Sequence, residues 1–317
     1  MRLQARSGGY RKHDEPDDIE RIMESPDYRP GDLMKHFADE EPKTAKDLLL
    51  EVMAGIESPK PWMPTGINRL DYFLDGGLRG GEVMLLAARP RVGKSALALQ
   101  IALNVAEQGR PVLIWSLEMR PEQWMRRALA SLSGVPLKKI RQGMDTMGDW
   151  DLRALEESAR ILASLPLIFA PSSAPTDPDA FELETRVRCE IDDVKLVIID
   201  YVQLMDPPPH AYSRENEVAQ ISKRIKRTSL IADVPIMALA QIRRDAEGKV
   251  PTLADLRESG ALEADADEVL FVHREMDSES HVLKNRGMLV LAKNRDGESG
   301  SFPVTYDWTR YRFDELQ

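Results

Sequence analysis

Short apolar runs alternate with longer amphipathic segments along most of this chain. Five runs have the length of a buried strand: Val83–Ala87, PVLIWS (111–116), LPLIFA (165–170), KLVIID (195–200) and PIMALA (235–240). The segments between them carry apolar residues at helical spacing, most clearly at 96–108, 121–134, 136–143, 148–165, 179–190 and 214–232. This alternation predicts an α/β fold with a mainly parallel central sheet, flanking helices and right-handed crossovers.

The amino-terminal part has a different composition from the rest. Residues 1–43 combine charges and prolines with few aliphatic side chains, which predicts a mobile polar tail or a short partner-binding segment. Residues 44–64 are expected to form a linker, and residues 65–317 the main domain.

The linker is predicted to begin with a short helix. Thr44 and Asp47 resemble a helix cap, and Leu48, Val52 and Ile56 then recur at helical spacing before the proline-rich SPKPWMP. This apolar stripe needs a covering surface, which is either its own domain or a neighbouring subunit.

The composition fits a globular protein in a reducing compartment. Of 317 residues, 42% are hydrophobic and 30% charged, and the single cysteine, Cys189, rules out a disulfide within the chain. No run reaches the roughly 18–20 apolar residues of a membrane span, and the amino terminus lacks the apolar core of a signal peptide. We therefore expect a cytoplasmic protein without membrane contact.

The charge distribution limits how the chain could bind nucleic acid. A formal net charge of −10 argues against wrapping nucleic acid over the whole surface, although a local basic site remains compatible with it. Two groups of cations are candidates: Lys223, Arg224, Lys226 and Arg227, and then Lys284, Arg286, Lys293 and Arg295. A ring assembly would gather such cations in a central channel, whereas the alternative is that they lie on solvated helix and strand faces.

The stretch GGEVMLLAARPRVGKS (80–95) has the pattern of a phosphate-binding loop, a strand followed by a loop and a helix. Lys94 would bind the β- and γ-phosphates of ATP, and the Ser95 hydroxyl would bind Mg²⁺. Ala88 replaces the usual first glycine, and the alternative is an ordinary strand-turn-helix with a solvated lysine. The predicted nucleotide-binding residues are Ala88, Arg89, Pro90, Arg91, Val92, Gly93, Lys94, Ser95, Ala96 and Asp200.

Three further polar residues lie just after predicted strands. Asp200 ends LVIID as a Mg²⁺-binding aspartate would, and Glu118 is the candidate general base for the attacking water. Gln241 is a candidate sensor of the γ-phosphate. Ligands of open α/β sheets bind beyond the carboxyl ends of the strands, so we expect these side chains to share one crevice with Lys94. The alternatives are a capping aspartate, an exposed acid at a turn and a glutamine bonded to loop backbone.

These motifs together resemble the carboxyl-terminal motor domain of the DnaB-type replicative helicases, a RecA-like P-loop NTPase. The resemblance rests on ARPRVGKSALALQIA (88–102), SLEMRPEQ (116–123), LVIIDYVQLM (196–205), SRENEVAQISKRIK (213–226), DLRESGALEADADEVLFVHRE (255–275) and LAKNRDGESG (291–300). Ala88 is typical of this family. The family's amino-terminal primase-binding domain is not recognisable, which leaves coupling to primase in doubt and suggests a phage- or plasmid-type helicase.

The resemblance implies further site residues. Arg257, Glu258 and Gly260 would contact single-stranded DNA, and Lys293 and Arg295 would reach the γ-phosphate held by the next subunit. The linker helix would pack on the adjacent protomer.

The resulting expectation is a homo-hexameric, ATP- and Mg²⁺-dependent 5′–3′ replicative helicase that moves on single-stranded DNA. A helicase loader and other replisome proteins are candidate partners. The alternative is a RecA-like factor for DNA binding, helicase loading or recombination that uses ATP as a switch and does not unwind DNA.

Overall fold

The computed structural model describes residues 43–58, 62–171, 175–207, 213–242, 249–277, 280 and 282–316. The chain divides into two units, Met1–Lys60 and Pro61–Gln317, each described here by itself. The predicted tail, residues 1–43, lies outside the described residues apart from Lys43. The expected boundary between linker and main domain at 64/65 stays a prediction.

Helix α3 (Ala45–Glu57) is the described element of the first unit. A reciprocal cap starts it, because the Asp47 amide donates to Thr44 Oγ1 at 3.3 Å and the Thr44 amide donates to Asp47 Oδ2 at 3.0 Å. The hydrogen bonds from Thr44 lower the pKa of Asp47. The apolar side chains of α3 are 48–68% exposed, so the described residues leave this apolar stripe uncovered. The stripe consists of Leu48, Leu49, Leu50, Val52, Met53 and Ile56.

The second unit is built on a nine-stranded sheet in the order β3-β2-β4-β5-β1-β6-β7-β8-β9. The strands are β1 (Val83–Ala88), β2 (Val112–Ser116), β3 (Leu167–Phe169), β4 (Leu196–Asp200), β5 (Ile236–Gln241), β6 (Glu268–Met276), β7 (Leu283–Asn294), β8 (Gly300–Asp307) and β9 (Arg312–Glu315). The pairs from β3 to β6 are parallel, and those from β6 to β9 antiparallel. The predicted α/β fold with a mainly parallel sheet is confirmed.

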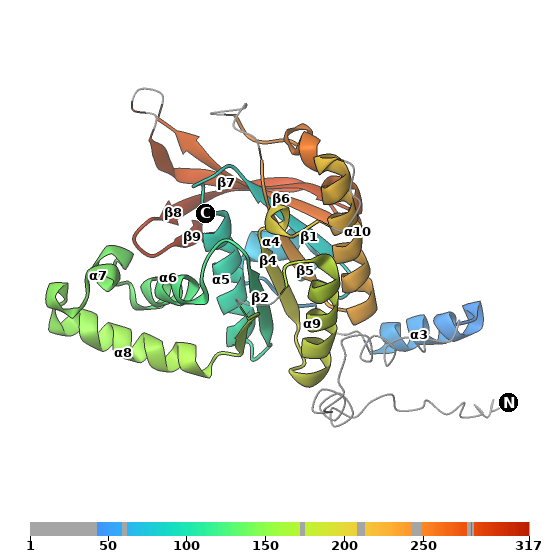
Figure 1. The fold of residues 1–317 in the computed structure, drawn as a ribbon, viewed down its shortest axis with the longest axis horizontal. Helices are drawn as coiled ribbons and strands as arrows, with labels where there is room; N and C mark the ends of the chain where they lie inside the picture. Colours follow the sequence, from blue (N-terminus) through green and yellow to red (C-terminus); the bar gives the residue numbers. More distant parts are fainter. Residues whose placement is uncertain are drawn as a thin grey trace. The chain divides into compact units, whose positions relative to one another are not determined.

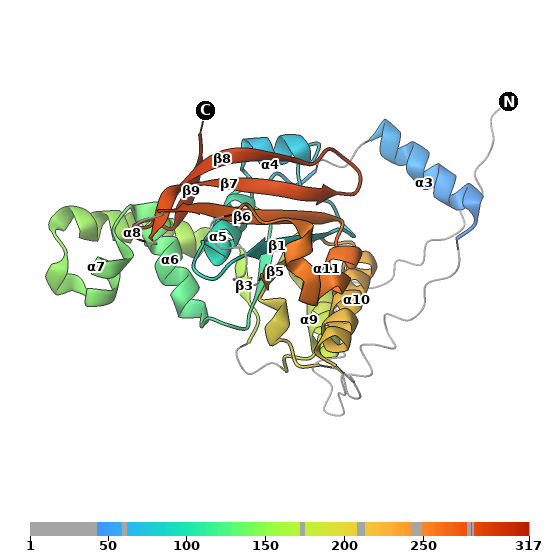
Figure 2. The same ribbon diagram turned by 90° about the horizontal axis from the view of Figure 1, so that it is seen from above.

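Helices lie on both faces of this sheet, and α7 and α8 extend to one side of it, where they contact α6 (Figures 1 and 2). The helices of this unit are α4 (Asn68–Phe73), α5 (Lys94–Glu107), α6 (Pro121–Ser133), α7 (Leu137–Gln142), α8 (Asp149–Ser164), α9 (Pro178–Ile191), α10 (Arg214–Ala232) and α11 (Gly260–Asp265), with 3₁₀ turns η1 (Met144–Thr146), η2 (Val202–Leu204) and η3 (Leu253–Ser259). Strand β1 alternates between two cores: Met84 and Leu86 pack with α5, whereas Val83 and Leu85 pack in the core that contains α10. Burial on both faces explains the continuous apolar runs of the parallel strands.

The topology gives the sheet two chemically distinct edges. The parallel strands β1, β2, β4 and β5 all end at one edge, which we call the carboxyl edge. Strand β6 begins at the opposite edge, the amino edge, where Glu268 lies beside Met84 and pairs with Asn294 near the end of β7. Residues that follow β7 therefore lie far from residues that follow β1.

Within the described residues, no helix is both long and apolar enough to cross a bilayer.

Candidate functional site

The predicted phosphate loop connects the end of β1 to the start of α5. Ala88 is fully buried, and the backbone then turns through left-handed conformations at Arg91 (φ 67°) and Gly93 (φ 118°). In the described part of the chain, no side chain caps the start of α5. Its first N–H groups are therefore suited to bind an anion, helped by the positive end of the helix.

Gly93 is required here for two reasons. Its φ is one that residues with a Cβ rarely adopt, and an added Cβ would lie 2.7 Å from Cζ of the Phe313 ring. Strand β9, which carries Phe313, is held on α5 by Gln100, whose side chain donates to the Phe313 carbonyl and accepts from its amide, both at 2.8 Å. The carboxyl-terminal strand thus supports the loop.

Lys94 and Asp200 form a buried ion pair at the centre of the carboxyl edge. Lys94 Nζ lies 3.1 Å from Asp200 Oδ1 and 4.7 Å from the centroid of the Tyr201 ring. Burial lowers the pKa of Lys94, while the carboxylates of Asp200 and Glu118 act in the opposite direction. A lysine poised in this way keeps its ammonium group at the loop where a phosphate would bind.

The second oxygen of Asp200 fits a metal ligand. Asp200 Oδ2 is buried and has no hydrogen-bond partner among the described residues, although a buried carboxylate oxygen normally has one. Ser95, half-buried in the first turn of α5, is the next residue after Lys94. A carboxylate and a hydroxyl are oxygen ligands of the type that Mg²⁺ prefers, so these residues fit the ion.

Glu118 and Gln241 are held beside this pair by backbone contacts. The amide of Glu118 donates to the Asp200 carbonyl at 3.1 Å, and the Glu118 side chain is exposed. Gln241 ends β5 opposite Ala88. The side chain of Gln203 donates through Nε2 to the Gln241 backbone carbonyl at 3.2 Å and accepts through Oε1 from the Gln241 backbone N–H at 3.5 Å, so Gln203 fixes this strand end. Gln203 was not predicted as a site residue, although it lies in the LVIIDYVQLM segment.

Lys293 and Arg295 do not join this group, because they lie at the amino edge. Lys293 Nζ donates to the carbonyls of Glu263 and Ala266, each at 2.7 Å, at the end of α11. Arg295 NH1 lies 3.0 Å from Asp267 Oδ1. Lys293 and Arg295 are two residues apart, a spacing that predicts that their side chains share one face of a strand. This prediction is wrong, since β7 ends at Asn294 and Arg295 lies in the following turn.

The predicted DNA-binding segment is helical and not an open loop. Arg257 and Glu258 lie in η3, and their side chains are outside the described residues. Gly260 begins α11 with a right-handed φ of −55°, and a Cβ there would meet nothing within 4 Å. Because Gly260 has no side chain, another molecule can approach its backbone closely. Its right-handed conformation does not itself require a glycine.

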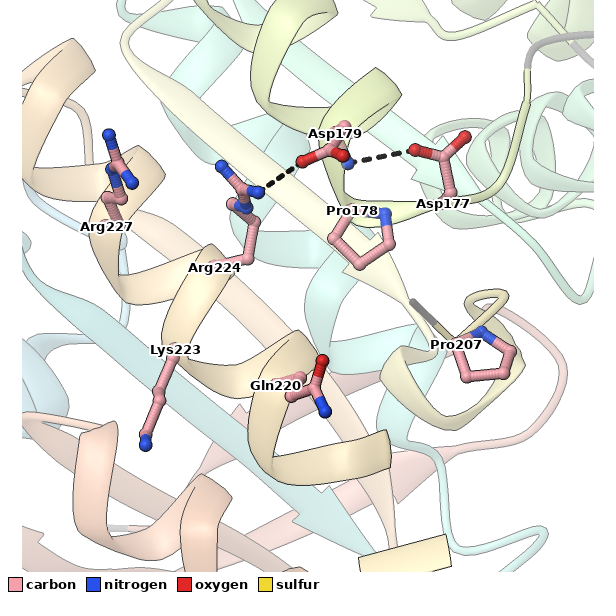
Figure 3. A pocket seen from close by; sticks show the side chains of 8 residues that line it. All are labelled: Asp177, Pro178, Asp179, Pro207, Gln220, Lys223, Arg224 and Arg227. Carbon is pink, nitrogen blue, oxygen red and sulfur yellow. Dashed lines mark hydrogen bonds and ion pairs between the residues drawn. The ribbon is translucent and has the colours of Figure 1, made fainter. Parts of the chain in front are cut away.

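The first basic cluster is divided among separate contacts. A cavity of about 400 Å³ lies between α9 and α10, and Lys223, Arg224 and Arg227 are among the residues that line it (Figure 3). Arg224 pairs with Asp179 and Glu182, and the neighbouring Lys226 turns to Asp267. These acids offset much of the cluster's charge, so in this region the interpretation as helix-face cations fits better.

Comparisons with known proteins agree with this geometry. Residues 63–315 match the model of the DnaB-like helicase C-terminal domain. The chain belongs to this family. It is 37% identical over 288 residues to the replicative DNA helicase DnaB of Buchnera aphidicola, covering 86% of this chain and 62% of that protein, and 32% identical over 278 residues to that of Treponema pallidum, covering 86% and 61%.

A solved DnaB-like replicative helicase, described with its interactions with primase, superimposes with a TM-score of 0.80 at 28% identity, covering 95% of this chain and 75% of that one. A solved ATPase domain gives 0.79 at 29% identity, covering 87% of this chain and all of that one. The predicted resemblance to the DnaB family is therefore confirmed. The chain spans about three fifths of the length of the curated relatives that it matches.

Replacing Gly93 with alanine tests the loop. We expect the Gly93→Ala protein to bind a fluorescent ATP analogue roughly tenfold or more weakly, because the new Cβ meets Phe313 in a left-handed backbone. Gly109→Ala is a matched control at the other end of α5, with φ 74° and open space around its Cβ. Parental affinity in the Gly93→Ala protein would contradict the assignment.

Glu268 at the amino edge predicts a pH dependence of stability. Burial and the nearby acids Glu82 and Asp267 raise its pKa from 4.5 to about 9. Between these values the unfolded chain loses a proton that the folded chain keeps, so the free energy of unfolding falls as pH rises. Urea unfolding across this range should show a flatter dependence in Glu268→Gln. Parallel curves for the two proteins would rule out this role of Glu268.

Proposed function

We propose that this chain is the motor domain of an ATP-dependent DNA helicase that works as a homo-hexamer on single-stranded DNA. The observation that carries the proposal is the buried Lys94–Asp200 pair at the start of α5, with an unpartnered Asp200 oxygen beside the loop. ATP hydrolysis with Mg²⁺ is part of the proposal, and so are 5′–3′ polarity, a phage- or plasmid-type origin and a cytoplasmic location.

Each residue at the carboxyl edge would have a separate task in hydrolysis. The backbone N–H groups of the loop and Lys94 would bind the phosphates. Lys94 would leave Asp200 when ATP binds, because the triphosphate carries more negative charge than the carboxylate. Ser95 and Asp200 would hold Mg²⁺, which neutralises the charge that develops on the phosphate oxygens. Glu118 would orient and deprotonate the attacking water, and Gln241 would contact the γ-phosphate.

A second copy of the chain would complete the site. Lys293 and Arg295 lie at the amino edge and Lys94 at the carboxyl edge, so the two cations are unsuited to reach the nucleotide of their own subunit. A head-to-tail contact would bring the amino edge of one copy to the carboxyl edge of the next, and repetition of such a contact by rotation closes a ring. The exposed stripe of α3 supports assembly, since it would be covered on an adjacent protomer.

Single-stranded DNA would run past the residues 257–260 of each subunit. The open backbone at Gly260 permits close approach of a phosphate oxygen to an N–H group. Arg257 and Glu258 are the other candidates, by the family motif alone. A helicase loader and other replisome proteins are candidate partners.

Strand displacement tests the function directly. With ATP and Mg²⁺, the protein should separate a partial duplex that has a 5′ single-stranded tail and leave its 3′-tailed counterpart paired, measured by release of a labelled strand. Lys94→Ala should abolish both hydrolysis and displacement, because the phosphates lose their buried cation. ATP-dependent DNA binding without displacement would favour the switch function instead.

Arg295 tests whether the site is shared between copies. Arg295→Ala should bind nucleotide normally but hydrolyse it roughly 10³-fold more slowly, as expected for a lost arginine finger. Mixing it with Lys94→Ala should restore part of the hydrolysis rate, because some interfaces then combine an intact phosphate loop with an intact finger. If the two variants exchange subunits and the mixture still does not hydrolyse ATP, the finger is not supplied in trans.

A further inference from the structure

Asp267 lies at the amino edge and is one of the few buried carboxylates there, 4% exposed. Its two oxygens have different partners. Oδ1 accepts from Arg295 NH1 at 3.0 Å, whereas Oδ2 accepts from Lys226 Nζ at 2.5 Å and from the Val83 amide at 2.8 Å. One side chain thus connects the proposed finger, helix α10 and the first residue of β1.

Backbone hydrogen bonds reinforce the same connection. The Arg295 amide donates to the Asp267 carbonyl at 3.0 Å, and the Asp267 amide donates to the Val83 carbonyl at 2.9 Å. Lys226 also donates to the Gly81 carbonyl at 2.8 Å, just before β1. The turn that carries Arg295 is therefore attached to the strand that leads, at its other end, into the phosphate loop.

The exposure of the partners indicates what Asp267 does. The Arg295 side chain is 64% exposed, so its guanidinium group remains available to another molecule while one nitrogen stays bonded to a buried oxygen. A solvent-exposed arginine samples many rotamers, and fixing it in advance reduces the entropy lost when it binds a phosphate. Burial alone would raise the pKa of Asp267, but bonds from Lys226, Val83 and Arg295 lower it and keep the carboxylate charged.

We propose that Asp267 is a positioning residue that orients Arg295 toward the nucleotide of the neighbouring copy and links this finger to the strand carrying its own subunit's phosphate loop. The inference rests on the proposed function, in which Arg295 acts in trans. It concerns a residue of the segment 255–275 to which the resemblance assigned no role.

Steady-state ATP hydrolysis by the full chain with single-stranded DNA tests the proposal. Asp267→Asn should lower kcat roughly tenfold at unchanged KM, because Arg295 loses a charge-assisted hydrogen bond but stays present. In an Arg295→Ala background the same substitution should change kcat less than about twofold, since the group that it orients is absent. Asp296→Asn, a neighbouring exposed carboxyl, should behave as the parent in both backgrounds.

A structural role alone predicts a different result. If Asp267 only stabilised the fold, its substitution would lower kcat by the same factor with or without Arg295, and this result would overturn the proposal. Unchanged kcat in Asp267→Asn would overturn it too. Melting temperature and ring mass are measured for every variant, and if Asp267→Asn does not fold, Asp267→Glu is used, which keeps the charge but displaces it.

The finger itself can fail separately. Normal hydrolysis by Arg295→Ala would remove the trans-acting finger from the proposed function, and the inference about Asp267 with it. A slow Arg295→Ala protein combined with additive Asp267 effects would leave the finger in place and reject only the positioning role.

Discussion

The buried pair of Lys94 and Asp200 is the interaction on which the rest of the site depends. An ammonium group in this position would be costly without a carboxylate at 3.1 Å, and the carboxylate would be equally costly without the lysine. Lys94 and Asp200 are 106 residues apart in the sequence. They meet because β1 and β4 run parallel on either side of β5, so that the loop after β1, which leads to Lys94, and Asp200, the last residue of β4, lie at the same edge. In the proposed function, Lys94 would bind a phosphate and Asp200 a divalent cation.

The change from parallel to antiparallel pairing after β6 has a second consequence. Strand β7 runs back along β6, so the chain that leaves β7 emerges at the edge opposite the phosphate loop. Lys293 and Arg295 lie there, so the length of the strands separates them from Lys94 of the same subunit. In the proposed mechanism this separation makes the assembly compulsory, because one subunit holds the nucleotide and another holds the arginine that completes its site.

Much of this arrangement could be predicted from the sequence, because it depends on local pattern. Apolar runs ending in Asp200 or leading to Gly93, Lys94 and Ser95 indicate strand ends, and the parallel topology then brings these ends together. Other features depend on pairings that local pattern does not record. Tertiary packing determines three of them: the helical form of the segment around Gly260, the end of β7 before Arg295, and the contact of Gln203 with Gln241. Asp267 was missed for the same reason, since its partners are 28 to 184 residues away.

The stiffness of β1 explains how Asp267 could link the phosphate loop to Arg295. Strand β1 pairs with β5 along Val83–Ala88 and with β6 from Met84 to Ala88, so it has hydrogen-bonded neighbours on both sides. A strand held in this way moves together with its neighbours and does not bend alone. A displacement of the phosphate loop would therefore reach Val83, and two hydrogen bonds join Val83 to Asp267. In our proposal, the state of one nucleotide then biases the finger that acts on the next.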